Sequence, residues 1–260
     1  MFTIIIPTHD RPYLLHRTLI SLARQTFRDF TVIIVSDSGK YIAPYEGLAA
    51  LPGHFLYILR NDQPGPAESR NLAIDLVKAD YAIFLDDDDT FEETHLESLA
   101  AAIGSSKPDI LYCDFKVVEE NRTTMPPQRI SETVIQIPGA TKSSVFVNNM
   151  IPNSCLVYSQ SVLKSFRYDP SLILFEDWDY LLGCLKHCRD LPHVPVSSVL
   201  IHKSYLAGEE NVRRGNVNND RLVDTTLEIY RRHPAPDQAS RLLRQKRFEE
   251  IGLKMPIECF

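Results

Sequence analysis

Four consecutive aspartates at positions 86–89 are the residues of this sequence best suited to chemistry. They follow an apolar segment, residues 81–85, that has the length and composition of a buried strand. Adjacent carboxylates raise each other's pKa values, and a divalent cation would relieve their repulsion. Because Mg²⁺ and Mn²⁺ bind through one or two carboxylates together with phosphate oxygens, the run favours metal and diphosphate chemistry. The alternative is a solvated turn in which one aspartate caps the next helix.

Two further charged residues stand at the ends of expected elements. Asp37 follows a β-branched segment, residues 31–35, and can either accept from a base imide or ribose hydroxyl or cap the next turn. Arg70 falls in the first turn of a helix expected from Pro66. A cation there adds to the positive end of the helix dipole, so we expect a phosphate or carboxylate partner in preference to a structural salt bridge.

The elements that must position these residues alternate along the first hundred positions. Strands are expected at residues 2–6, 31–35, 55–59 and 81–85. Helices are expected to begin at Asp10, as a capping carboxylate followed by Pro12, and at Pro66. Such alternation implies parallel strands whose carboxyl ends share one edge of the sheet. Thr8, Asp10, Asp37 and the aspartate run should therefore meet at that edge, where ligands bind in open α/β sheets.

The second half of the chain is less regular. Strands are expected at residues 110–118, 154–158 and 194–201, and residues 123–141 read as a long loop with at most one short strand. An apolar stripe from Trp178 to Leu185 predicts a helix with Glu176 and Asp177 at its N-terminus. By itself, Asp177 would be interpreted as a helix cap. Beyond Tyr205 the pattern predicts a loop and two helices.

Five segments, taken in order and spacing, resemble the inverting family 2 glycosyltransferases, which have the GT-A fold. The matching segments are residues 4–11, 35–39, 65–71, 84–89 and 175–179. The resemblance covers residues 1–205. It implies an α/β fold: a GT-A domain with a Rossmann-like, mostly parallel sheet flanked by helices. Residues 206–260 are then expected to form a helical C-terminal extension.

The resemblance also implies a role for each matching residue. Asp177 corresponds to the catalytic base, with Glu176 beside it. Asp88 corresponds to the metal ligand, although the run of four lets the match slide by one residue, and His202 to a histidine that approaches the metal or diphosphate in some members. Thr8 and Asp37 would hold the nucleobase, Arg70 the nucleotide and donor sugar, and Asp86 the ribose or sugar. The full set implied to bind the nucleotide or donor is Pro7, Thr8, Asp10, Arg11, Asp37, Arg70, Asp86 and Asp87.

The implied reaction is transfer of a sugar, with inversion, from a nucleoside diphosphate sugar to a hydroxyl group. UDP- or dTDP-linked donors, a glycan or lipid-linked acceptor, Mn²⁺ or Mg²⁺ as cofactor and bacterial surface polysaccharide or glycolipid assembly belong to this expectation. A base on one face of the sugar and a neutralised leaving group on the other are what such a reaction needs.

Two alternatives remain from the residues. One is a phosphatase of the haloacid dehalogenase type, because residues 86–90 fit a D-x-D-x-T pattern with Asp86 as nucleophile. Three strands before the motif, and Asp89 where a glycine is usual, count against it. The other is a non-catalytic nucleotide-sugar binding module, which would not need Asp177.

Composition limits the remaining function classes. The chain has 260 residues and a net charge of −6, which disfavours nucleic-acid binding, and it has no apolar run long enough to span a membrane. Five cysteines without framework spacing indicate free thiols in a reducing cytoplasm. Cys184 and Cys188 are expected in the core instead of at a metal.

The C-terminal tail has the opposite charge to the rest of the chain. Residues 211–260 carry ten basic and seven acidic side chains, which would suit peripheral contact with the inner face of an anionic membrane. Because the charges are mixed, we favour packing on the domain through Leu242, Leu243, Phe248 and Ile251. Arg213 and Arg214 are candidates to close over the donor diphosphate.

Overall fold

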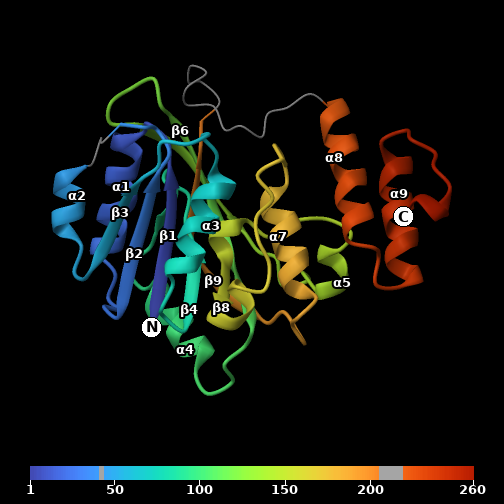
Figure 1. Ribbon diagram of the computed structural model, residues 1–260, viewed down its shortest axis with the longest axis horizontal. Helices are drawn as coiled ribbons and strands as arrows, with labels where there is room; N and C mark the ends of the chain where they lie inside the picture. The colour runs from blue at the N-terminus through green and yellow to red at the C-terminus, as the bar shows by residue number, and fades with distance from the viewer. Residues whose placement is uncertain (41–43, 205–218) are drawn as a thin grey trace.

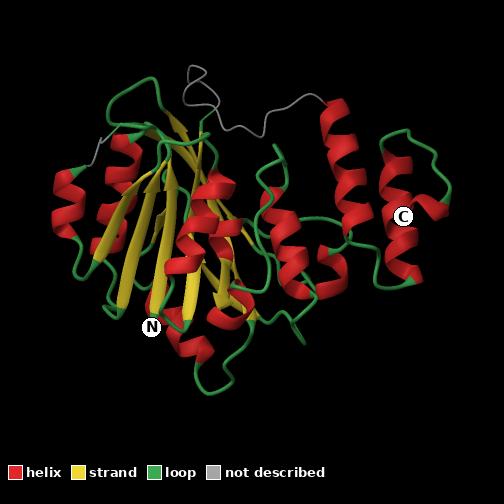
Figure 2. Ribbon diagram, viewed as in Figure 1, coloured by secondary structure: helices red, strands yellow, loops and turns green. Residues whose placement is uncertain are grey.

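The computed structural model describes residues 1–40, 44–204 and 219–260. Its centre is a nine-stranded mixed sheet in the order β3-β2-β1-β4-β8-β6-β9-β5, with β7 paired to β6 (Figures 1 and 2). The strands are β1 Phe2–Thr8, β2 Phe30–Ser36, β3 Phe55–Leu59, β4 Tyr81–Phe84, β5 Thr90–Phe91, β6 Ile110–Asn121, β7 Gln128–Ile135, β8 Leu156–Ser159 and β9 His193–Lys203.

The first four strands are parallel, as the alternating pattern predicts. β8 then runs antiparallel to both β4 and β6, and β9 is parallel to β6. The helices are α1 Pro12–Ala23, α2 Tyr45–Ala50, α3 Pro66–Leu76, α4 His95–Ile103, α5 Lys142–Val145, α6 Gln160–Leu163, α7 Glu176–Leu185, α8 Asn219–Arg232 and α9 Gln238–Glu250. Figure 1 shows α3 in front of the parallel strands. To the right of these strands in that view, α7, α8 and α9 follow one another.

The turn from β1 into α1 differs from the expectation in one respect. Pro12 does begin α1, but the N-cap is Arg11 and no side chain caps the helix. Asp10 has a φ of 51°, in the left-handed region that aspartate tolerates better than most residues, and its side chain is exposed. The prediction that Asp10 caps α1 is therefore wrong; it forms the tight turn instead.

The strand β7 is longer than the sequence predicts. It spans eight residues and pairs with the far half of β6 as a hairpin arm, with most of its side chains exposed. In turn, β6 continues to Asn121, three residues past the expected end. This extension matters for function because it carries Glu120 and the following Arg122 to the carboxyl edge of the neighbouring strands.

The C-terminal segment forms the two expected helices but packs by other residues. Phe248 is buried as predicted, whereas Leu242 and Leu243 are 50% and 52% exposed and Ile251 is 59% exposed, so the predicted apolar contact face is wrong. The inward face of α9 consists of Ser240, Arg244 and Phe248.

The contact between the tail and the rest of the chain is made largely by α8. The ring of Tyr230 packs edge-on against Trp178 of α7, with centroids 6.0 Å apart.

Within the part of the chain that the structure describes, no helix is long and apolar enough to traverse a bilayer. Arg213 and Arg214 lie outside the described residues.

Candidate functional site

The ends of β1 and β2 and the start of α3 meet at the predicted edge of the sheet. The Asp37 N–H donates to the Thr8 carbonyl, which joins the two strand ends. The Asp37 carboxylate accepts from the Gly65 N–H at 2.6 Å through one oxygen and lies 2.7 Å from His9 Nδ1 through the other. The carboxylate is thus buried and fixed at the start of α3, in the place expected for a nucleobase ligand.

The aspartate run forms a turn that is held from several sides. Asp87 is fully buried, accepts from the Thr8 hydroxyl at 2.6 Å and forms an ion pair with Arg11. Burial raises the pKa of Asp87 to about 7, although Arg11 opposes this increase. The Asp89 carboxylate accepts from the Ser154 hydroxyl and from the His202 N–H, both at 3.1 Å. These two aspartates therefore tie the turn to β1, to the start of α1, to the segment before β8 and to β9.

Arg70 joins the aspartate turn to α7. Its guanidinium is buried and lies 3.0 Å from Asp86 Oδ1 and 3.0 Å from Glu176 Oε1. The ring of Tyr168 lies below it, 5.2 Å from the guanidinium carbon to the ring centroid. Arg70 therefore forms salt bridges with two carboxylates of the chain, which is the alternative that the sequence analysis did not favour, and an anionic ligand of Arg70 stays a prediction. This bridge brings the predicted donor edge and the predicted catalytic pair into one site.

The backbone of the residue before the predicted catalytic pair is strained. Phe175, the N-cap of α7, has a φ of 61°, an unfavourable left-handed conformation for an aromatic residue. It starts α7 so that Glu176 and Asp177 occupy its first turn. Asp177 Oδ1 accepts from the Trp178 N–H at 2.8 Å. Burial, together with the neighbouring Glu176, raises the pKa of Asp177 to about 6, which suits a group that must take a proton near neutral pH.

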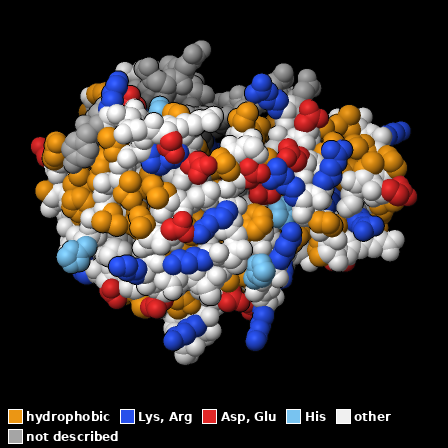
Figure 3. Space-filling view, viewed as in Figure 1, with side chains coloured by type: hydrophobic (Ala, Val, Ile, Leu, Met, Phe, Trp, Pro, Cys, Tyr) orange, Lys and Arg blue, Asp and Glu red, His pale blue; other side chains and the backbone are white. Residues whose placement is uncertain are grey.

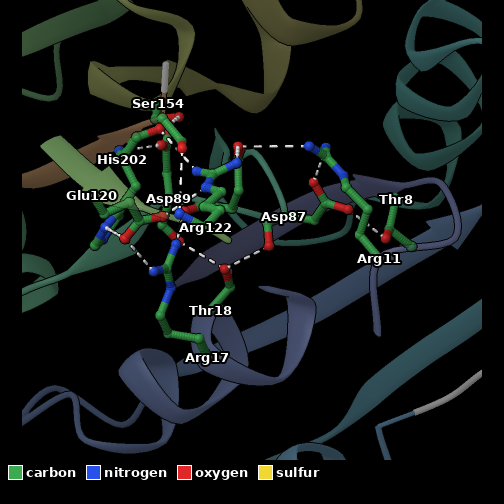
Figure 4. A network of polar contacts seen from close by, with 12 residues as sticks. Thr8, Arg11, Arg17, Thr18, Asp87, Asp89, Glu120, Arg122, Ser154 and His202 are labelled. Carbon is green, nitrogen blue, oxygen red and sulfur yellow. Dashed lines mark hydrogen bonds and ion pairs between the residues drawn. The ribbon is translucent and has the colours of Figure 1, made fainter. Parts of the chain in front are cut away.

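A second cluster of charges surrounds Asp88. Figure 4 labels its members Arg11, Arg17, Glu120 and Arg122. Asp88 Oδ2 lies 3.0 Å from Arg122 Nη1 and 3.6 Å from Arg11 Nη1. Arg122 Nε also donates to Glu120 Oε1 at 2.7 Å, and the other Glu120 oxygen lies 2.7 Å from Arg17 Nη1. Burial alone would raise the pKa of Glu120, but its bonds to His202, Arg17 and Arg122 lower it to about 2. Glu120 is therefore ionised in the folded protein.

Three members of this cluster escape the sequence analysis: Arg17, Glu120 and Arg122. Arg17 lies in the middle of α1, where a charged residue normally faces solvent. Glu120 and Arg122 are two positions apart, the spacing that puts side chains on one face of a strand. That spacing would have been the signal if the sequence had shown that β6 reaches residue 121.

The residues predicted to bind a metal differ in how well they fit one. Mg²⁺ or Mn²⁺ needs few protein carboxylates when phosphates supply other ligands, so Asp88 fits such an ion in the presence of a diphosphate. The described residues contain no group of three His, Cys, Asp or Glu side chains that could hold an ion by themselves. Both ring nitrogens of His202 already have partners, Nδ1 with Glu120 at 3.0 Å and Nε2 with the Thr90 hydroxyl at 2.9 Å. Metal binding by His202 stays a prediction and would require one of these bonds to break.

A groove of about 540 Å³ lies beside the Asp88 cluster, between α1 and β5. Its lining includes Tyr13, Arg17, Thr90 and His202 but neither Asp37 nor Asp177. The groove is therefore not the predicted donor site, which is defined by the side chains at the ends of β1, β2 and β4.

Comparison with known proteins agrees with this arrangement. Residues 3–166, more than half of the chain, match the family described as Glycosyl transferase family 2. The chain belongs to glycosyltransferase family 2. The haloacid dehalogenase alternative is thereby excluded: Asp86 follows the fourth strand of a glycosyltransferase sheet and is paired with Arg70.

Relatives of this family 2 glycosyltransferase come from several bacteria. An uncharacterized glycosyltransferase of Haemophilus influenzae is 28% identical over 239 residues, 88% of this chain and 77% of that protein. The succinoglycan biosynthesis protein ExoW of Rhizobium meliloti is 27% identical, over 70% of this chain and 62% of ExoW. The poly(ribitol-phosphate) β-N-acetylglucosaminyltransferase TarP of Staphylococcus aureus is 29% identical, over 64% of this chain and 48% of TarP.

Solved structures show the same GT-A fold. S. aureus TarS 1–349 in complex with UDP-GlcNAc superposes with a TM-score of 0.71 at 17% identity, covering 97% of this chain and 73% of that one. The mannosyltransferase PcManGT of Pyrobaculum calidifontis, in complex with GDP-Man and Mn²⁺, gives a TM-score of 0.61 at 12% identity, covering 95% and 69%.

Proposed function

We propose that this glycosyltransferase moves a sugar, with inversion, from a UDP- or dTDP-linked donor to a hydroxyl group of a glycan or lipid-linked acceptor. The observation that carries the proposal is the Arg70 bridge, which joins Asp86 at the donor edge to Glu176 beside Asp177. The printed names of TarP and ExoW support an acceptor in bacterial surface polysaccharide assembly, and the TarS complex with UDP-GlcNAc supports a UDP-linked donor.

The proposed mechanism assigns one task to each part of the site. The nucleotide is held by the end of β1 with Pro7 and Thr8, by Asp10 and Arg11 in the turn that follows, and by Asp37. Asp177 takes the proton of the acceptor hydroxyl while the hydroxyl oxygen bonds to the anomeric carbon. The bond from that carbon to the diphosphate breaks on the opposite face, so the configuration inverts. A general base of this kind contributes about 10²- to 10⁴-fold to the rate.

The diphosphate leaves with negative charge that must be neutralised. Asp88 would hold Mn²⁺ or Mg²⁺ against it, and such an ion supplies Lewis-acid stabilisation of the leaving group. Arg70 and Arg11 add positive charge at the same edge of the sheet. Both guanidiniums are held by aspartates of the turn, so they are already oriented before a donor arrives.

Calorimetric titration of the protein with UDP, dTDP, GDP and CDP, each in Mn²⁺ and in EDTA, tests the donor assignment. The expected result is binding of UDP or dTDP that is stronger with Mn²⁺ and is lost in Asp88→Ala. Equal binding of all four nucleotides, or binding of GDP or CDP alone, would contradict the proposed donor. Binding that EDTA does not weaken would contradict the metal assignment.

A further inference from the structure

The carboxylate of Asp88 faces the guanidinium of Arg122. A metal-binding carboxylate would be expected to face an ion instead. Its side chain is only 6% exposed, and that of Arg122, 3.0 Å away, is 4% exposed. Arg122 is held in place by two further bonds, from Nε to Glu120 and from Nη2 to the His202 carbonyl at 3.0 Å. A buried carboxylate is costly without a cationic partner, and Arg122 supplies one within the chain.

Four of the charges around Asp88 balance one another, and Arg11, 3.6 Å from Asp88 Oδ2, is paired with Asp87. Asp88 and Glu120 carry two negative charges, and Arg17 and Arg122 carry two positive ones. A divalent ion bound to Asp88 would therefore place two uncompensated positive charges beside two guanidiniums in a water-poor setting, where charges interact strongly. The negative charges of a diphosphate would remove this imbalance.

We propose that Arg122 is a displaceable counter-ion of Asp88. It pairs with the carboxylate while the donor site is empty, and it releases the carboxylate when a divalent cation arrives together with a nucleoside diphosphate. Arg122 thereby makes metal binding depend on the nucleotide, so that free ions in solution do not occupy the site. This inference rests on the proposed function, because it takes Asp88 to be the metal-binding carboxylate.

Arg122 also has a purely structural interpretation, because it links the end of β6 to β9 by its hydrogen bond to the His202 carbonyl. Loss of such a link would lower stability but would not change the affinity of Asp88 for metal. Arg17 provides a matched control, because it bonds to the same Glu120 and to the main-chain carbonyl of Asp88 but not to the Asp88 carboxylate. Replacing either arginine by glutamine removes one positive charge and one bond to Glu120. The two differ in the contact with the Asp88 carboxylate, which only Arg122 makes, and in their main-chain acceptor, the His202 carbonyl for Arg122 and the Asp88 carbonyl for Arg17.

The test measures the affinity of the protein for Mn²⁺ by electron paramagnetic resonance of the free ion, with and without UDP. Without UDP, Arg122→Gln should bind Mn²⁺ about tenfold more tightly than the wild type, whereas Arg17→Gln should change the affinity by less than about threefold. With saturating UDP, the difference between Arg122→Gln and the wild type should shrink. When Asp88→Asn is combined with Arg122→Gln, the double variant should lose the increase in Mn²⁺ affinity.

Each other result has a distinct meaning. Equal Mn²⁺ affinity of Arg122→Gln and the wild type without UDP, while wild-type UDP binding still requires Mn²⁺ and Asp88, overturns the inference and leaves the proposed function intact. A gain of the same size in Arg17→Gln also overturns it, because charge alone would then explain the effect. Failure of the wild type to bind either UDP or dTDP contradicts the proposed function instead. If Arg122→Gln does not fold, Arg122→Lys takes its place, because one ammonium group cannot bond to Asp88, Glu120 and the His202 carbonyl together. An Mn²⁺ affinity of Arg122→Lys equal to that of the wild type without UDP then overturns the inference.

Discussion

Asp177 and Glu176 lie next to each other in the first turn of α7, and the burial of Asp177, together with repulsion from Glu176, sets the pH at which the proposed base works. Burial and Glu176 raise the pKa of Asp177 to about 6. A base must be deprotonated, so kcat/KM for donor turnover should fall as the pH drops through about 6. Removing the negative charge in Glu176→Gln should lower the pKa of Asp177 and move this fall to lower pH. Rates of nucleotide release between pH 4.5 and 8 would show it, and an unmoved profile would contradict the pairing.

Asp37 offers a second test at the same scale. Its carboxylate is oriented by the Gly65 N–H and by His9, so it can accept from a nucleobase without rearranging the backbone. Hydrogen bonds to a charged group contribute about 1.5–3 kcal/mol, so Asp37→Ala should weaken UDP binding by roughly tenfold or more. Asp75→Ala, at the exposed end of α3, is the control and should leave the affinity unchanged. Equal affinities of the two variants in calorimetry would remove Asp37 from the site.

Among the helices, α9 is held on the protein by the hydrogen bonds of a buried arginine, Arg244. Arg244 is fully buried, donates to the carbonyls of Phe146 and His233 at 2.6 to 2.9 Å, and lies 3.9 Å above the ring of Tyr230. Burial lowers its pKa to about 10, so it remains protonated at neutral pH. Arg244→Met would leave these carbonyls unsatisfied and should lower the free energy of unfolding by about 2–4 kcal/mol.

The exposed Arg241 on the same helix is the matched control. Arg241→Met should change the free energy of unfolding by less than about 0.5 kcal/mol in urea titrations. A similar loss in both variants would mean that Arg244 acts through helix propensity or surface charge, and not through its carbonyl partners.

The sequence predicts some of these elements well and others poorly, for physical reasons. β1 and β2 are β-branched and buried, and polar side chains follow them directly, so both the strands and the meeting of Thr8, Asp37 and the aspartate turn can be predicted. β7 is largely polar and exposed, and its strand conformation comes from pairing with β6. The inward face of α9 contains an arginine, so a search for apolar periodicity selects the wrong face. The same limitation hides Arg122, whose position depends on how far β6 extends.

At the scale of the whole molecule, we propose that residues 206–260 are an extension of the catalytic domain and not an independent unit. His233 Nε2 lies 2.8 Å from Asp179 of α7, both buried, and Tyr230 covers Trp178 of the same helix. The face of α8 and α9 that Figure 3 shows mixes acidic, basic and hydrophobic side chains, which suits a solvated face better than an anionic membrane.

Removal of the tail should therefore damage the helix that carries Asp177. A chain that ends at residue 204 would expose Trp178 and leave Asp179 without its histidine partner. Its free energy of unfolding should fall by roughly 3 kcal/mol or more, with loss of the near-ultraviolet circular dichroism of the buried aromatic residues. An unchanged urea midpoint would show that the domain ends near residue 205.

Asp177 is the proposed base of an inverting sugar transfer, and the donor is held by other residues of the same site. The most direct measurement compares donor binding and turnover in the wild type and in Asp177→Asn, with the UDP-linked sugar that binds best. Donor affinity should be almost unchanged in Asp177→Asn, and nucleotide release should fall by about 10²- to 10⁴-fold. Turnover by Asp177→Asn at the wild-type rate would show instead that the chain binds the donor at this site without using Asp177 for chemistry.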